Sequence, residues 1–130
     1  MVLCLALAAC TPAATVATET QRGVPDGYGG EIDLLDPKPV ATWLDDERRQ
    51  FAVVTVGSGS CPPVPTSIEA TDADTIAITF VPATAPVCSA DLSATTHVFD
   101  RPDEITLDGD VTIEILLDDE TNYEYTVVIG

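Results

Sequence analysis

Basic residues are scarce in this chain. Its 130 residues include 5 Lys and Arg against 22 Asp and Glu, which gives a formal net charge of −17. Proteins that bind nucleic acid by neutralising phosphates need clustered Lys and Arg, and anionic membrane surfaces repel an acidic protein. The composition therefore excludes nucleic acid as a partner, and any membrane attachment has to come from something other than charge.

Histidine and methionine are nearly absent, with one residue of each. A metal centre built on either side chain is therefore disfavoured. Hydrophobic residues make up 45% of the chain, and they recur in short periodic runs, which argues against disorder throughout. At roughly 100–200 residues per domain, the length predicts a single small domain.

No apolar run is long enough to span a bilayer as a helix, which needs about 20 residues. The run Val2–Ala9 instead suits the apolar region of a secretory signal. The sequence Leu7-Ala8-Ala9-Cys10 resembles the lipobox of bacterial lipoproteins, which has Leu, two small residues and Cys. The resemblance implies that residues 1–9 are removed as a signal peptide and that the Cys10 sulfur carries a diacylglycerol. It places the protein at the extracytoplasmic face of the cell membrane, attached through the lipid.

The region around the expected anchor has two further features. No Lys or Arg precedes the apolar run, although secretory signals begin with positive charge, so we expect the start of the signal to lie upstream of the printed sequence. Residues 10–30 are rich in Thr, Ala, Pro and Gly without periodicity, which predicts a flexible tether with a root-mean-square reach of about 25 Å. The alternative to the lipoprotein interpretation is a chance Ala-rich N-terminus that contains a Cys. The expected domain then covers residues 31–130.

Two cysteines, Cys61 and Cys88, remain for the folded domain. In an oxidising compartment they predict a disulfide. The alternative is a metal site, but neither Cys has a second Cys or a His at tetrahedral ligand spacing. A disulfide would close a loop of about 28 residues, worth about 3.5 kcal/mol in the chain-entropy model.

Period-two runs rich in Val, Ile and Thr follow residue 31, separated by Asp, Gly and Pro. About seven short strands with regular turn signals predict an all-β fold. We expect an antiparallel β-sandwich, with an immunoglobulin-like arrangement as one option, or a small barrel. Trp43 precedes both Cys61 and Cys88, which differs from antibody domains, where a Trp lies between the cysteines.

Three hairpins can be tested by register, because directly opposed residues share a face of the sheet. The predicted opposed pairs are Leu117 with Tyr123, Ile68 with Ile78, Ala70 with Ile76, Trp43 with Ala52, and Leu44 with Phe51.

Outside these hairpins, a further strand is expected over Thr95–Phe99, and residues 102–110 are expected to be mostly loop.

The sequence offers little for catalysis. His97 is the only His, and we expect it to be a surface or half-buried strand residue. The segment Gly57-Ser58-Gly59-Ser60 is no nucleophile elbow, because that motif leads into a helix and Cys61-Pro62-Pro63 stops one here. We therefore expect a protein that is not an enzyme.

Calcium is the one ion that the acidic turns suggest, because Ca²⁺ takes hard oxygen ligands. None of the acidic clusters has EF-hand spacing, and the alternative is that Asp stabilises turns while charge keeps the domain in solution. Calcium binding is the third function considered. Its candidate ligands are Asp72, Asp74, Asp118, Asp119 and Glu120, and further acids cluster at Asp45-Asp46-Glu47 and at Asp108 with Asp110.

The segments Gly57–Thr66 and Cys88–His97 resemble a pattern in small secreted lipoproteins of the actinobacterial type, over roughly Ala41 to Phe99. That resemblance implies a location and a fold, and it implies no activity. From the residues alone, Pro62 and Pro63 fix an extended exit from a strand.

The expected function is a non-catalytic binding or envelope-support role, with a cell-wall polymer, an envelope protein or a cation as partner. An exposed aromatic patch around Tyr28 or Trp43 would mark a binding module. The alternative is an extracellular inhibitor or accessory subunit that presents the Gly57–Thr66 loop to a partner protein, since fixed loops often carry recognition. No cofactor besides the lipid on Cys10 is expected, unless Ca²⁺ binds.

Overall fold

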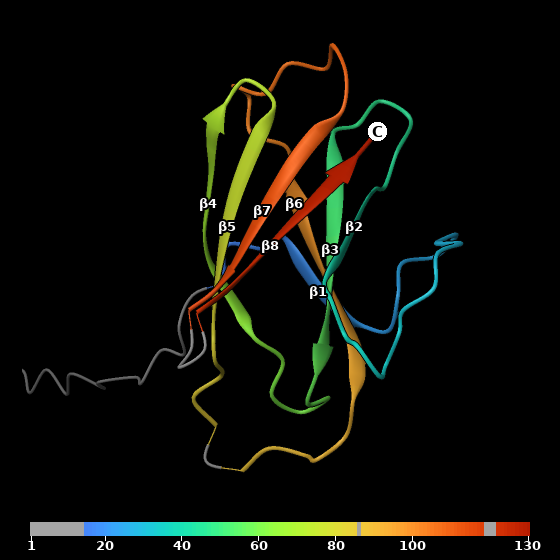
Figure 1. Ribbon diagram of the computed structural model, residues 1–130, viewed down its shortest axis with the longest axis vertical. Coiled ribbons are helices and arrows are strands. Elements are labelled where there is room, and N and C mark those ends of the chain that lie inside the picture. Colours follow the sequence, from blue (N-terminus) through green and yellow to red (C-terminus); the bar gives the residue numbers. More distant parts are fainter. Residues whose placement is uncertain (1–14, 86, 119–121) are drawn as a thin grey trace, which may run out of the picture.

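A computed structural model describes residues 15–85, 87–118 and 122–130, and these residues form a two-layer β-sandwich (Figure 1). They contain no α-helix, and so none long and apolar enough to cross a membrane. The sheets have the strand orders β1-β6-β3-β2 and β4-β5-β7-β8, so the predicted sandwich is confirmed and the barrel alternative is wrong. The strands are β1 (Glu19–Arg22), β2 (Val40–Trp43), β3 (Gln50–Gly57), β4 (Val64–Asp72), β5 (Thr75–Val81), β6 (Ser93–Asp100), β7 (Val111–Leu117) and β8 (Tyr123–Ile129).

The core lies between the two sheets. Successive side chains in a strand point to opposite faces, so every second residue of a strand enters the core. Phe51 stacks on Phe99 with ring centroids 5.4 Å apart. The opposite sheet contributes Ile76, Ile78, Phe80, Val111, Ile113 and Ile115, all at most 1% exposed. Because this packing holds the strands in place, a functional site is expected in the loops at the two ends of the sandwich.

Two of the three predicted hairpin registers are confirmed. Leu117 lies opposite Tyr123, and Ile68 lies opposite Ile78. The third is wrong by one residue, because Trp43 lies opposite Phe51.

The register error has a physical cause in the β2–β3 loop. The Asp45 carboxylate accepts hydrogen bonds from the backbone N–H groups of Arg49 (2.9 Å) and Gln50 (3.2 Å). Arg48 adopts a left-handed φ of 54°, and the N–H of Leu44 donates to the Gln50 carbonyl at 3.0 Å. Together these features close the loop one residue earlier than the hydrophobic pattern predicts.

Strands β5 and β7 are parallel, which the sequence did not predict. Their register runs from Thr75 opposite Thr112 to Phe80 opposite Leu117. The intervening β6 lies in the other sheet, so the chain returns through residues 101–110 and enters β7 from the end at which β5 begins. Residues 102–110 are loop, as predicted, and their Ile105 is only 3% exposed.

The predicted tether 10–30 is wrong from Val16 onward, and so is the expected domain start at residue 31. Strand β1 pairs with β6, with Glu19 opposite Val98, and the N–H of Val16 donates to the Pro65 carbonyl at 3.0 Å. All four β1 side chains are exposed, so no apolar alternation signalled this strand. The predicted signal peptide 1–9 and Cys10 lie outside the described residues.

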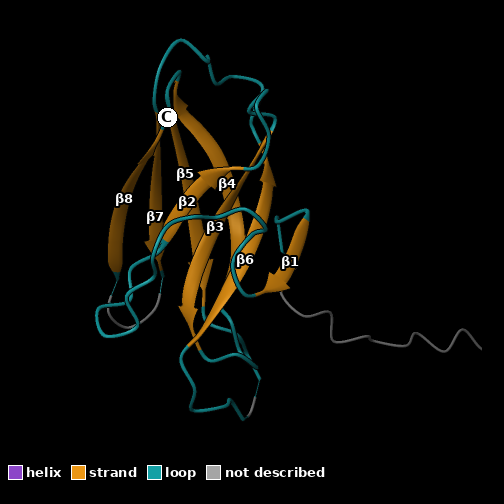
Figure 2. Cartoon of the chain, turned by 90° about the vertical axis from the view of Figure 1, so that its right-hand side faces the viewer, coloured by secondary structure: helices purple, strands orange, loops and turns teal. Residues whose placement is uncertain are grey.

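Residues 23–39 cross the outer face of the first sheet. They must do so because β1 and β2 lie at opposite edges of that sheet, and Figure 2 shows this connection passing in front of β3. The Thr96 hydroxyl donates to the Gly23 carbonyl at 2.6 Å. Ala52, Val54 and Thr96 point to this outer side and are nevertheless at most 1% exposed, so the connection closes a second buried layer.

Candidate functional site

The sandwich has two chemically different ends. At the upper end in Figure 1, the Arg48 guanidinium donates to the Gly109 carbonyl at 3.2 Å and the N–H of Thr106 donates to the Ala73 carbonyl at 2.8 Å, which links three loops. We call this the acidic end, formed by residues 45–49, 72–74 and 101–110. The opposite end carries the disulfide Cys61–Cys88, and we call it the disulfide end, formed by residues 58–63, 82–85 and 87–92.

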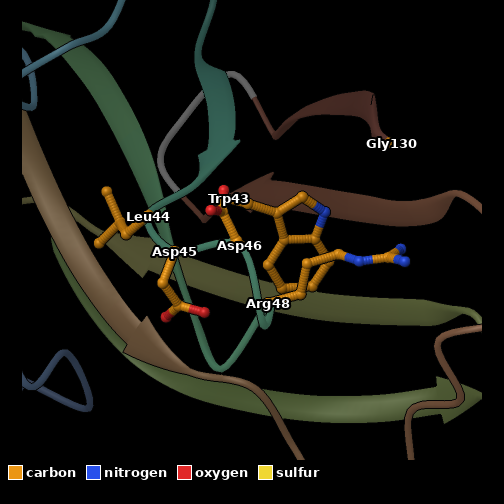
Figure 3. Close-up of a pocket in the computed structure, with 6 residues that line it drawn as sticks. All are labelled: Trp43, Leu44, Asp45, Asp46, Arg48 and Gly130. Carbon is orange, nitrogen blue, oxygen red and sulfur yellow. The ribbon is translucent and has the colours of Figure 1, made fainter.

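A shallow, open hollow of about 400 Å³ lies at the acidic end beside the only tryptophan of the chain (Figure 3). In the close-up, the Trp43 indole stands at the centre, with the two carboxylates on one side and the Arg48 guanidinium on the other. The hollow is lined by Trp43, Leu44, Asp45, Asp46, Arg48 and Gly130.

Local structure holds these side chains in place. Trp43 ends β2, and its ring packs edge-on against the Phe51 ring at 6.0 Å. The Trp43 Nε1 is buried and has no hydrogen-bond partner among the described residues. Hydrogen bonds from the backbone, the N–H of Arg49 first among them, lower the pKa of Asp45, so its carboxylate stays ionised and closes the loop. Asp46 and Arg48 are therefore the charged groups best placed to meet a ligand.

Changing Asp45 should disturb the hollow through the loop. Asp45→Ala removes the acceptor for two backbone N–H groups, and we expect a lower melting temperature together with a shift in the emission of Trp43. The matched control is Asp46→Ala, which removes the neighbouring charge but neither of these hydrogen bonds. Equal melting temperatures and emission spectra for the two variants would contradict this role of Asp45.

A second, smaller hollow adjoins the first. It has a volume of about 70 Å³, shares Trp43 and Leu44 with the larger hollow, and includes Tyr28 on its wall. The two aromatic residues that the sequence singled out thus both border the smaller hollow, and Leu44, which is 37% exposed, lines both hollows. We call Tyr28, Trp43, Leu44, Asp46 and Arg48 the Trp43 surface.

The calcium candidates do not form one group. Asp72 and Asp74 border a separate hollow at the acidic end, whereas Asp118 lies beyond the far end of β7, where its N–H donates to the Phe80 carbonyl. Asp119 and Glu120 lie outside the described residues. Within the described parts of the chain, no three His, Cys, Asp or Glu side chains are placed to hold a metal ion.

The acids of the β4–β5 turn instead bond their own loop. The Asp72 carboxylate accepts from the N–H of Ala73 at 2.7 Å, and the Asp74 carboxylate accepts from the Thr75 hydroxyl at 2.9 Å. These contacts are those expected of Asp as a turn former.

The disulfide end is tightly tied together. The Cys61–Cys88 disulfide is present, as predicted, and it joins the β3–β4 and β5–β6 connections, which cross between the sheets at this end. The Asp91 carboxylate accepts from the N–H of Gly59 at 3.0 Å and from the hydroxyls of Ser89 and Ser93. These hydrogen bonds, led by that of Ser89, hold the pKa of Asp91 far below its usual range.

The predicted Gly57–Thr66 loop is shorter than expected at both ends, because Gly57 ends β3 and β4 begins at Val64. Pro65 fits in β4 because that strand lies at the edge of its sheet, where a missing N–H donor costs little. Beside the disulfide lies a hollow of about 300 Å³ with mainly apolar walls, among them Val56, Phe80 and Leu117.

His97 is a core residue, so the expectation of a surface or half-buried position is wrong. It lies opposite Val53 on the inner face of its sheet and is 1% exposed. Its Nε2 is 3.0 Å from the Thr55 hydroxyl, and its ring packs edge-on against Phe80 at 5.1 Å. Burial lowers the pKa of His97 to about 4, so the imidazole is neutral at physiological pH.

Sequence reasoning found Tyr28 and Trp43 but missed Leu44, Asp46 and Arg48 as parts of the same surface. The available signal was the charged run that directly follows Trp43 and Leu44.

In comparisons with known proteins, no family model matches the chain, and no curated protein or solved structure matches it either. Its function is therefore inferred from its own residues.

Proposed function

We propose that this protein is a non-catalytic binding domain of the cell envelope, held at the extracytoplasmic face of the membrane by a diacylglycerol on Cys10. We further propose that its Trp43 surface binds a neutral, polyhydroxylated polymer of the cell wall. The observation that carries the proposal is the open hollow of about 400 Å³ beside Trp43.

The chemistry of the Trp43 surface suits such a ligand. Binding sites commonly combine aromatic or apolar walls with a few polar groups that set orientation. Trp43, Leu44 and Tyr28 supply apolar area for the carbon faces of sugar rings, while Asp46 and Arg48 supply an acceptor and a donor for hydroxyl groups. A shallow, open hollow admits a segment of a long chain more readily than it encloses a small molecule.

The negative charge of the acidic end limits which polymers of the cell wall could bind at the Trp43 surface. The loops of the acidic end contain nine acids and three arginines: Asp45, Asp46, Glu47, Asp72, Asp74, Asp103, Glu104, Asp108 and Asp110, with Arg48, Arg49 and Arg101. This excess repels anionic polymers, because like charges that face each other across an interface oppose binding. A neutral ligand is therefore favoured over a phosphate-rich one.

A fluorescence titration tests the binding site directly, because the single Trp reports on the hollow. We expect a saturable change in Trp43 emission with neutral wall polysaccharide. Asp46→Ala and Arg48→Asn each remove one charged hydrogen-bonding group, worth about 1.5 kcal/mol or more, so each should weaken binding about tenfold. Asn is chosen at position 48 because it tolerates the left-handed φ.

Val87→Ala at the opposite end is the matched control and should leave the affinity unchanged. The proposed ligand class would be wrong if no neutral wall polymer changed the emission. The proposed site would be wrong if both variants bound as tightly as the unmodified protein.

The anchor has its own test. Mass spectrometry of the mature N-terminus should find Cys10 as the first residue with a diacylglycerol on its sulfur, and Cys10→Ser should release the protein from the membrane fraction. An unmodified Cys10 in the mature protein would overturn the proposed location.

The alternative function uses the other end. The pinned connection 58–63, with Ser60 and Ser89 bonded across the disulfide end, would suit an inhibitor or accessory subunit that presents a rigid loop to a partner protein. Substitutions at Ser58 and Pro62 would then abolish capture of that partner, whereas Asp46→Ala would not affect it.

A further inference from the structure

We propose that the disulfide end rests on the lipid surface, so that the acidic end and the Trp43 surface point away from the membrane. This inference builds on the proposed lipid at Cys10 and adds an orientation and a lipid-contacting surface. We call that surface the contact surface: residues 58–63, 82–85 and 87–92, joined by the Cys61–Cys88 disulfide.

The first support is the short chain between the lipid and the fold. Val16 bonds to Pro65 and Thr18 bonds to Val98, both through backbone hydrogen bonds of 3.0 Å or less, so the sandwich holds the chain from Val16 onward. The stretch from Cys10 to Val16 spans at most about 20 Å even when fully extended. The domain is therefore kept close to the lipid.

The second support is the place where this short chain joins the sandwich. Pro65 is the second residue of β4, which starts next to the disulfide end at Val64 and runs to Asp72 at the acidic end. From Pro65 to Asp72 a strand rises about 23 Å. If the acidic end faced the membrane, the chain from Val16 would have to cover more than its full length to place Cys10 in the lipid, so that orientation is excluded.

Composition then favours the disulfide end over the flank beside β1 and β4. That flank exposes Glu19, Arg22 and Glu69. The contact surface has one charged residue, Asp91, in its 16 described residues, and Asp91 is already engaged by three hydrogen-bond donors. Asp118 borders the contact surface at the hollow beside the disulfide.

The contact surface also presents apolar side chains. Val87 is 82% exposed and Leu92 is 56% exposed, and such side chains suit the boundary between headgroups and acyl chains. Leu35 is exposed as well, at 97%, but Asp33 and Asp36 flank it on the 23–39 connection, which opposes contact with an anionic surface.

The distribution of charge also favours the orientation with the disulfide end at the membrane. The negative surface potential of a membrane decays over a Debye length of about 8 Å at physiological ionic strength. With the disulfide end down, the nine acids of the acidic end lie about a strand length away, roughly 23 Å, where this potential is largely screened. The repulsion that the lipid anchor has to offset then comes mainly from the acids near the disulfide end, Asp91 and Asp118.

Lipid-depth quenching tests the orientation on the lipidated full-length protein. The protein is placed in vesicles of phosphatidylcholine and phosphatidylglycerol whose acyl chains carry bromine, which quenches nearby indoles. Trp43 itself reports on the acidic end. Val87→Trp in a Trp43→Phe background reports on the contact surface, and Leu92→Trp in the same background is a second reporter should the first variant fold poorly.

We expect a large loss of emission for the indoles introduced at positions 87 and 92, and no loss for Trp43. Quenching of Trp43 equal to that at position 87 would overturn the orientation, and so would the absence of quenching at both ends. Detection of the diacylglycerol on Cys10 in the same preparation separates the two proposals, because its absence would contradict the anchor rather than the orientation. If a co-purifying protein covered position 87, the indole introduced there would keep its emission, and that result would favour a protein partner at this end.

Discussion

Removing the Cys61–Cys88 disulfide is expected to lower the free energy of unfolding by about 3.5 kcal/mol, because the bond closes a loop of about 28 residues in the unfolded chain. The effect is large for this fold, since small domains are stable by only about 5–15 kcal/mol. The double variant Cys61→Ala/Cys88→Ala should therefore unfold at much lower urea concentration than the unmodified protein.

The bond has a second role that a single number does not capture. It ties the two connections that cross between the sheets at the disulfide end, next to the hydrogen bonds that Asp91 accepts. Ser60→Ala is a suitable control, because it removes a hydroxyl that accepts from the N–H of Ser89 but leaves the disulfide intact. A loss of less than about 1 kcal/mol in the double variant, within the range of ordinary surface substitutions, would contradict a stabilising role for the bond.

Acid should destabilise the protein through His97. The pKa of His97 is lowered to about 4 in the folded state by burial, whereas an unfolded His titrates near about 6.5. Between these two values the unfolded chain binds a proton that the folded chain does not. Stability therefore falls as the pH drops from about 6.5 to about 4, by about 3 kcal/mol, and the His97 contribution levels off below that range.

The measurement is urea unfolding of the unmodified protein and of His97→Gln at several pH values from 4 to 7. Only the difference between the two pH profiles is attributed to His97, because the carboxyl groups titrate alike in both proteins. We expect this difference to shrink as the pH falls, since only the unmodified protein loses the His97 contribution. Parallel profiles would show that His97 is not held neutral by burial.

The elements that the sequence predicted well are those with alternating apolar residues on both partners. The hairpin of β7 and β8 is of this kind, with Ile113 opposite Val127 and Ile115 opposite Tyr125. Such a register is strongly specified, because a slip of one residue would move every apolar side chain to the wrong face. The disulfide was equally accessible, because only two cysteines remained for it.

The features that were missed depend on contacts that no local pattern contains. Strand β1 is exposed on every side chain and forms because β6 offers a free edge. The parallel pairing of β5 and β7 follows from the passage of β6 through the other sheet. Both are consequences of topology, and topology is set by the whole chain.

Only part of the candidate site could be predicted from the sequence, because the rest depends on contacts that no local pattern contains. Tyr28 and Trp43 stand out as aromatic residues in a chain that has few of them. From the sequence alone, Arg48 is interpreted only as a positive charge that balances its acidic neighbours. Its place in the hollow depends on the left-handed φ and on the Asp45 hydrogen bonds that shape the β2–β3 loop.

Amide hydrogen exchange of the full-length protein, with and without neutral wall polysaccharide, tests the central claim most directly. We predict that the polymer slows exchange in residues 42–48 and 26–28, which form the Trp43 surface, and leaves residues 58–63 and 87–93 unchanged. Slower exchange confined to the disulfide end, or no change anywhere, would contradict the claim that this protein binds its ligand through the Trp43 surface.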